Sequence, residues 1–176
     1  MIPDSSFFRA LIFALISAIT LTACEQATET TAGEPEEVLW DEMIPLKEGV
    51  EDSLIDVLAS TDEENWEKLD FQQPVKELNG KFVRVPGFVV PLESDEAGLL
   101  SEFLLVPYFG ACIHSPAPPP NQVVYVKLAE PVLFESIYDP YWVIGTMTTT
   151  AYTSEMADSV YQIAAVKIED YTDELE

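Results

Sequence analysis

The chain has 176 residues, of which 32 are acidic and 8 basic, so its formal net charge is −24. A field this negative repels phosphate backbones, and we therefore expect no nucleic-acid partner. The apolar run near the N-terminus has about a dozen residues, too few for a membrane-spanning helix, which needs about 20. Two cysteines in the whole chain do not make a disulfide framework.

The first two dozen residues resemble the signal peptide of a bacterial lipoprotein. The apolar segment 10–21 ends in L-T-A-C (21–24), which resembles a lipobox. The resemblance implies diacylglycerol on the Cys24 sulfur, cleavage after Ala23 and acylation of the new N-terminus. Glu25 at the next position favours the outer over the inner membrane. The alternatives are an ordinary cleaved signal with a chance cysteine and a short anchor helix.

Three regions follow from this interpretation. Residues 1–23 are a signal peptide that we expect to be helical, and 24–37 a lipidated tether. The tether is acidic, rich in small residues and without apolar periodicity, so we expect it to be flexible. Residues 38–176 have the length of one domain and contain no second apolar run of spanning length. We expect them to form a single β-rich domain outside the cytoplasm.

The front of this domain is mixed in character. Short helical segments are predicted near 39–44, 53–58 and 62–69, and a tight turn at Asn79-Gly80 leads into the first strand. Runs dense in Val, Ile, Phe, Tyr and Trp then predict strands. These strands are expected at 81–92, 102–107, 121–128, 140–148 and 159–169.

The strand pattern predicts a mainly β fold with short helices. Several strands are apolar on both faces, which is typical of a closed barrel with further cover outside. Pro86 and Gly87 interrupt the first long strand and predict a bend or bulge. We expect a barrel like the oligonucleotide/oligosaccharide-binding (OB) fold, with a short helix at 151–158 between late strands. A β-sandwich or another small barrel is the competing architecture.

The one place where chemically active side chains gather is the segment 107–122. Cys112 and the chain's one histidine, His114, stand two residues apart, so in extended backbone both face the same side. Gly110 before them permits unusual backbone angles, and the prolines behind them favour a stiff conformation. The residues expected to shape a pocket around the pair are Tyr108, Gly110, Asn121, Gln122 and Glu93.

Several interpretations of this pair remain open. Thiolate and imidazole both suit a zinc or copper ion, although further ligands would have to be found. Alternatively, Cys112 is a nucleophile with His114 as its base. The structural alternative is a buried cysteine and a histidine bonded to a loop carbonyl. The proline run is also typical of ligands for aromatic-lined grooves.

Two smaller features carry expectations of their own. Arg84 falls in an apolar strand and is expected to pair with one of the many carboxylates. Trp40, Trp66, Tyr141 and Trp142 are expected in the core or as surface cover, with a ligand groove as the alternative.

Four stretches, V-R-V-P-G-F-V-V-P-L-E (83–93), F-L-L-V-P-Y-F-G-A-C-I-H (103–114), P-P-P-N-Q-V-V-Y-V (118–126) and Y-W-V-I-G-T-M (141–147), carry a resemblance to a known family. They resemble an uncharacterised family of proteobacterial periplasmic proteins and lipoproteins, a domain of unknown function. The resemblance implies an exported domain associated with transport systems, and it shifts the Cys112–His114 pair towards a functional site. Ala117 departs from the proline that the family pattern implies.

The expected function is that of a non-enzymatic accessory or binding lipoprotein on the periplasmic face of the envelope. It would be held to a membrane by lipid on Cys24, and would bind a metal ion or assist an ABC-type transport complex or another envelope protein. Cys112 and His114 would be the metal ligands. The alternatives are a thiol-dependent enzyme and a pure protein-interaction module.

Overall fold

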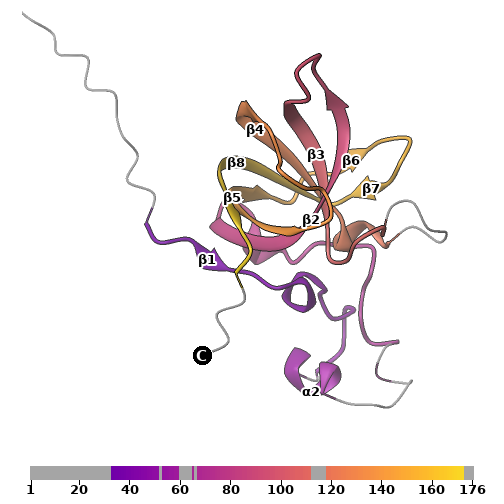
Figure 1. The fold of residues 1–176 in the computed structure, drawn as a ribbon. Coiled ribbons are helices and arrows are strands. Elements are labelled where there is room, and N and C mark those ends of the chain that lie inside the picture. The colour runs from indigo at the N-terminus through magenta and orange to yellow at the C-terminus, as the bar shows by residue number, and fades with distance from the viewer. Residues whose placement is uncertain (1–32, 52, 60–64, 66, 112–117, 173–176) are drawn as a thin grey trace, which may run out of the picture. The chain divides into compact units, whose positions relative to one another are not determined.

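The computed structural model describes residues 33–51, 53–59, 65, 67–111 and 118–172 (Figure 1). The predicted signal peptide and Cys24 lie outside these ranges, as do Cys112 and His114. Among the residues it describes, no helix is both long and apolar enough to cross a membrane.

Five strands form a closed barrel (Figure 1). They follow the order β2-β3-β4-β8-β5, and β5 pairs back with β2. β4 and β8 are parallel, and the other barrel pairs are antiparallel. Three strands in a meander, with the fifth inserted between the third and the fourth, give the OB-like barrel that was predicted. The strands are β2 (Phe82–Ser94), β3 (Leu100–Val106), β4 (Val124–Val132), β5 (Pro140–Thr148) and β8 (Tyr161–Asp170).

The first strand, β2, pairs with two different strands along its length. It pairs with β5 up to Phe88 and with β3 from Phe88 onward. At Gly87, a Cβ atom would lie 2.7 Å from the carbonyl oxygen of Val106, so only glycine lets the two strands cross this closely. The strand thus serves two sides of the barrel and changes partner directly after Gly87, whereas its register irregularities lie between Pro91 and Ser94.

The barrel core is built from alternate residues of the strands, because successive side chains point to opposite faces. In β2, the valines at 83, 85 and 89 are buried and lie inside. Phe134, in the connection between β4 and β5, packs edge-on against both Phe103 and Tyr141. The 133–139 connection contains no helix, so Phe134 covers the core here with a side chain.

The N-terminal part packs beside the barrel. Its elements are β1 (Glu36–Glu37), the 3₁₀ helix η1 (Trp40–Met43), α2 (Leu54–Leu58) and the 3₁₀ helix η2 (Lys76–Leu78). η1 and α2 confirm the helical segments predicted at 39–44 and 53–58. Of the segment predicted at 62–69, residues 62–64 and 66 lie outside the described residues, and 67–69 form a turn that ends in a bridge from Leu69 to Leu46. Glu36 and Glu37, expected at the end of the flexible tether, instead pair in parallel with β2.

The helix predicted at 151–158 was wrong. This stretch holds β6 (Tyr152–Thr153) and β7 (Asp158–Ser159), which pair as a two-stranded hairpin. The hydroxyl of Ser154 donates to the carbonyl of Ala157 and accepts from its amide, at 2.9 and 3.2 Å. A serine that bonds to nearby backbone in this way competes with helix formation.

Candidate functional site

The segment 107–122 connects β3 to β4 and carries most of the predicted site. Its described parts are 107–111 and 118–122, so the two ends are placed. Cys112 and His114 lie between them, outside the described residues. Their approach to one another therefore stays a prediction, whereas the way in which both ends are held is a finding.

The first end is held by a turn against the barrel. Gly110 has a φ of 80°, the left-handed conformation that favours glycine, as its place in the sequence predicted. The amide of Ala111 donates to the carbonyl of Tyr108 at 3.3 Å. Ala111 is buried in a cluster with Leu104 and Val106 on the outer face of β3. The chain thus folds back over the barrel before it reaches Cys112.

The second end is held by two amide side chains in the 3₁₀ helix η3 (Pro120–Gln122). Asn121 is fully buried, and its Nδ2 donates to the carbonyls of Asp70 and Gln73 at 2.8 and 3.1 Å. Gln122 Nε2 donates to the carbonyl of Trp40 at 2.9 Å. Both residues were expected to shape a pocket, but these bonds fasten the proline run to the N-terminal part. Among the described residues, the buried Oδ1 of Asn121 has no hydrogen-bond partner.

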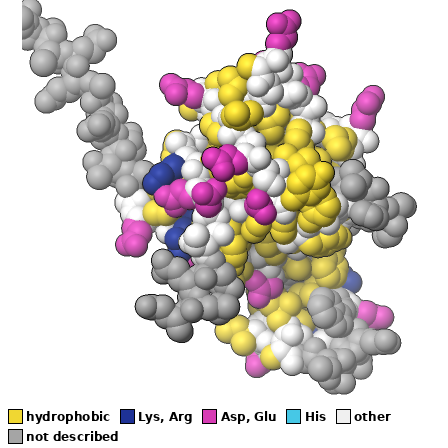
Figure 2. Space-filling view, in the orientation of Figure 1, with side chains coloured by type: hydrophobic (Ala, Val, Ile, Leu, Met, Phe, Trp, Pro, Cys, Tyr) yellow, Lys and Arg dark blue, Asp and Glu magenta, His cyan; other side chains and the backbone are white. Residues whose placement is uncertain are grey.

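An exposed group of aromatic side chains lies at the start of the segment. Tyr108 is 55% exposed, Phe109 48% and Tyr138 67%. The Phe109 ring lies 5.1 Å from that of Tyr138 and 6.2 Å from that of Phe88. Three separate parts of the chain thus converge, and we call Phe88, Tyr108, Phe109 and Tyr138 the aromatic ridge. Figure 2 shows hydrophobic side chains forming a continuous area over one flank of the barrel.

Glu93 is not brought to this site. It pairs with Glu102 near the far end of the β2–β3 hairpin, whereas the segment leaves β3 beside Phe88. Glu93 lies five residue steps along the strand from Phe88, or about 16 Å at 3.3 Å per residue. Within the described parts of the chain, no three His, Cys, Asp or Glu side chains lie close enough together to hold a metal ion.

The face that OB barrels commonly offer to ligands is covered by the chain itself. That face belongs to the second and third barrel strands, here β3 and β4. Tyr125 of β4 is buried there and stacks on Tyr152 of β6, with ring centroids 3.9 Å apart. Ala111 and Ala157 are buried in the same cluster. The β6–β7 hairpin and the 108–111 turn thus occupy the surface where another OB barrel would bind its ligand.

Beneath this cover, Tyr125 bonds to a carboxylate. Burial, and next the hydrogen bond that it donates to Glu102, raise the pKa of Tyr125 above its usual range. The same bond, followed by the one from Lys127, lowers the pKa of Glu102. The pair stays in one protonation state near neutral pH, so it is suited to fixing β3 to β4 rather than to exchanging protons.

The sequence predicted the segment 107–122 but only part of the aromatic ridge. Phe109 stood inside the motif, but Tyr138 comes from a connection with no recognisable pattern. Its only sequence signal is an aromatic residue among acidic and small ones, which also occurs in ordinary loops. Of the smaller features, Arg84 pairs with Glu37 as predicted.

Comparison with known proteins places the chain in a family. Residues 40–170 match a family model described as "Protein of unknown function (DUF3299)". The crystal structure of a DUF3299 family protein from Pseudomonas aeruginosa PAO1, at 2.45 Å resolution, is 39% identical in sequence. The match covers 81% of this chain and 99% of that chain, with a TM-score of 0.61. No curated protein gives a significant match. The chain therefore belongs to the DUF3299 family, in agreement with the predicted resemblance to a domain of unknown function.

Proposed function

We propose that the protein is a lipid-anchored binding protein of the cell envelope, which engages a protein partner through the aromatic ridge. The observation that carries the proposal is the ring contact between the exposed Phe109 and Tyr138, with the exposed Tyr108 next to Phe109 in the sequence. Aromatic side chains are enriched at protein interfaces because they bury large areas with little loss of conformational freedom. Exposed rings in contact with one another are a typical anchor for such an interface.

The charge around the ridge supports a partner with a basic rim. Asp139, which is exposed, follows Tyr138 directly. The whole chain carries a net charge of −24, which attracts and orients a positively charged surface. A transport complex or another envelope protein of this character is the partner class that we propose. Cys112 follows the ridge in sequence, so a metal or thiol contact would form beside the bound partner.

Photo-crosslinking in a bacterial envelope tests the contact surface. A photoreactive amino acid is placed at position 109, at 138 or, as a control, at 166 of the full lipidated chain. Val166 is 67% exposed on β8 and lies outside the ridge. We expect one discrete crosslinked product from 109 and 138 and none from 166. Equal products from all three positions, or none from any, would rule out the ridge as a specific contact.

The affinity for the partner identified by crosslinking then measures how much the aromatic ridge contributes to binding. Phe109→Ser combined with Tyr138→Ser should weaken binding at least tenfold, or about 1.4 kcal/mol. Val166→Ser should leave it unchanged. The anchor is tested separately: Cys24→Ala should move the protein from the membrane fraction to the soluble fraction and abolish palmitate labelling.

A further inference from the structure

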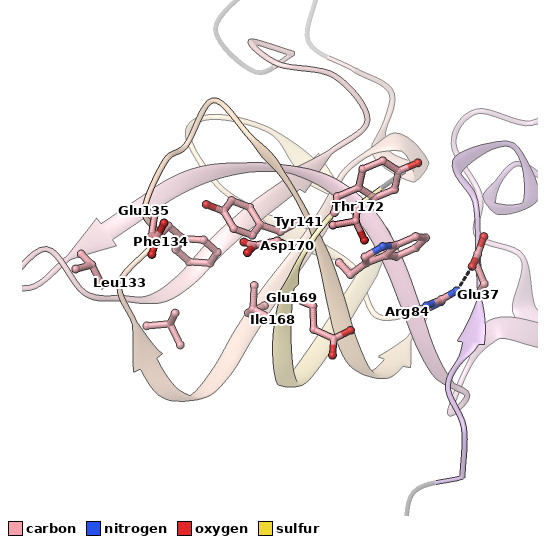
Figure 3. A pocket seen from close by; sticks show the side chains of 13 residues that line it. Glu37, Arg84, Leu133, Phe134, Glu135, Tyr141, Ile168, Glu169, Asp170 and Thr172 are labelled. Carbon is pink, nitrogen blue, oxygen red and sulfur yellow. Dashed lines mark hydrogen bonds and ion pairs between the residues drawn. The ribbon is translucent and has the colours of Figure 1, made fainter. Parts of the chain in front are cut away.

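A groove of about 860 Å³ lies where β5 begins and β8 ends, apart from the aromatic ridge (Figure 3). Aromatic rings from Phe134, Tyr141 and Trp142 line it together with carboxylates of the β8 end and of the 133–139 connection. Figure 3 shows Glu135 and Glu37 on opposite sides of the view, with Asp170 between them.

The aromatic lining is fixed before any ligand arrives. Phe134 and Tyr141 meet edge to face with centroids 5.0 Å apart. The Tyr141 hydroxyl donates to the carbonyl of Ser136 at 2.8 Å and accepts from its amide at 3.2 Å. Trp142 lies 5.2 Å from the ring of Tyr171. A preorganised surface of this kind spares a ligand the cost of ordering it.

Some carboxylates of the groove form ion pairs within the chain and others do not. Glu37 pairs with Arg84, and Glu169 pairs with Lys167. Glu135 and Asp170 make no ion pair with any residue that the structure describes. Two carboxylates thus remain available beside aromatic rings, an arrangement that favours cations with apolar stems.

Arg84 already makes this kind of contact within the chain. Its guanidinium lies 4.6 Å from the centre of the Trp142 ring while it pairs with Glu37. We propose that the rest of the groove binds an extended basic segment of a protein in the same manner. Lysine or arginine groups would pair with Asp170 and Glu135, and their methylene stems would lie on the half-buried ring of Phe134, which the buried Tyr141 supports from below. The inference deepens the proposed function, since it names the chemistry of a bound partner at a second surface.

A model peptide tests the groove. The probe is a fluorescent peptide of about eight residues that alternates lysine and serine and spans roughly 26 Å when extended. It is titrated by anisotropy into the full chain in neutral detergent at physiological ionic strength. We expect saturable binding, and none by a matched peptide of glutamate and serine. A failure of the lysine peptide to saturate would overturn the proposal.

Two double variants separate the groove from general attraction by a negative protein. Glu135→Gln with Asp170→Asn removes two charges inside the groove, and Glu96→Gln with Glu155→Gln removes two exposed charges outside it. The groove variant should weaken peptide binding at least tenfold, and the control less than twofold. Equal weakening in both would show diffuse attraction and overturn the site. The ridge variant Phe109→Ser/Tyr138→Ser should bind the peptide normally, so a failed ridge and a failed groove give different results.

Discussion

At the scale of single residues, Tyr161 connects the barrel to the N-terminal part through its hydroxyl group. It is fully buried in β8, and its hydroxyl accepts from the amide of Val75 at 2.6 Å and donates to the carbonyl of Met43 at 2.9 Å. One side chain thus satisfies two backbone groups of the N-terminal part from inside the barrel. Burial raises the pKa of Tyr161 to about 12.

Replacing this hydroxyl should be costly. Tyr161→Phe leaves a buried amide and a carbonyl without a partner, so the free energy of unfolding should fall by about 2–4 kcal/mol. Urea unfolding measures the loss, with the exposed Tyr138→Phe as a control that changes little. A loss below about 0.5 kcal/mol would show that solvent or a rearrangement satisfies both groups.

The raised pKa of Tyr161 predicts that the folded state loses stability at alkaline pH. The phenol has a folded pKa of about 12 against 10 when unfolded, so its contribution is complete below pH 10. This stabilising contribution is lost as the pH rises from 10 to 12, because the Tyr161 phenol of the unfolded chain loses its proton at a lower pH than that of the folded chain. Stability of the wild type should therefore fall more steeply across that window than that of Tyr161→Phe. Parallel curves for the two proteins would contradict this.

Close packing between β5 and β8 leaves room only for glycine at position 145. A Cβ atom there would lie 2.3 Å from the carbonyl oxygen of Ala164 on β8, and backbone cannot move aside as a side chain can. Gly145→Ala should therefore lower the free energy of unfolding by about 3 kcal/mol. Gly33→Ala, which meets no atom within 4 Å, is the control and should stay within about 0.5 kcal/mol. Calorimetric melting of both variants gives the comparison.

At the scale of elements, the sequence predicted what depends on local pattern. Dense runs of β-branched and aromatic residues marked all five barrel strands. The helix predicted at 151–158 failed because Tyr152 gains more from stacking on Tyr125, far away in the sequence, than from helix formation. Local propensity cannot weigh a contact of that kind.

The candidate site was only half predictable for the same reason. Asn121 bonds to the carbonyl of Asp70, 51 residues earlier in the chain, and Gln122 to that of Trp40, 82 residues earlier. Neither pairing leaves a trace in the neighbouring sequence. Glu93 seemed available because it lies in an acidic turn, but the register of β2 with β3 sets it at the opposite end of the hairpin.

The segment 107–122 leads to a prediction about metal binding. If Cys112 and His114 are ligands, calorimetric titration at neutral pH should show one Zn²⁺ or Cu⁺ bound per chain. Cys112→Ser and His114→Ala should each weaken binding at least tenfold, because each removes one donor atom. Glu93→Gln should have no effect, since it lies about 16 Å along the hairpin from the base of the loop. Unchanged binding in both loop variants would remove the metal site.

At the scale of the whole molecule, charge opposes folding. The chain has 32 acidic residues against 8 basic ones, so most carboxylates cannot have a basic partner of their own. Raising NaCl from 0.01 to 0.15 M shortens the screening length from about 30 to about 8 Å, which weakens this repulsion. The melting temperature should rise over that range, and KCl should act equally. A fall in melting temperature would mean that ion pairs such as Glu37–Arg84 outweigh the repulsion.

The two-residue strand β1 has a mechanical consequence. Any tension on the chain ahead of Gly33 reaches the barrel through Glu36 and Glu37, whose ladder and side chains hold them to β2. Just behind, the indole of Trp40 donates to the carbonyl of Pro86 on the same strand. A pull on the N-terminal side of the domain is thus taken up by the strand that pairs with both β3 and β5, so the barrel wall resists as a unit before any loop is drawn out.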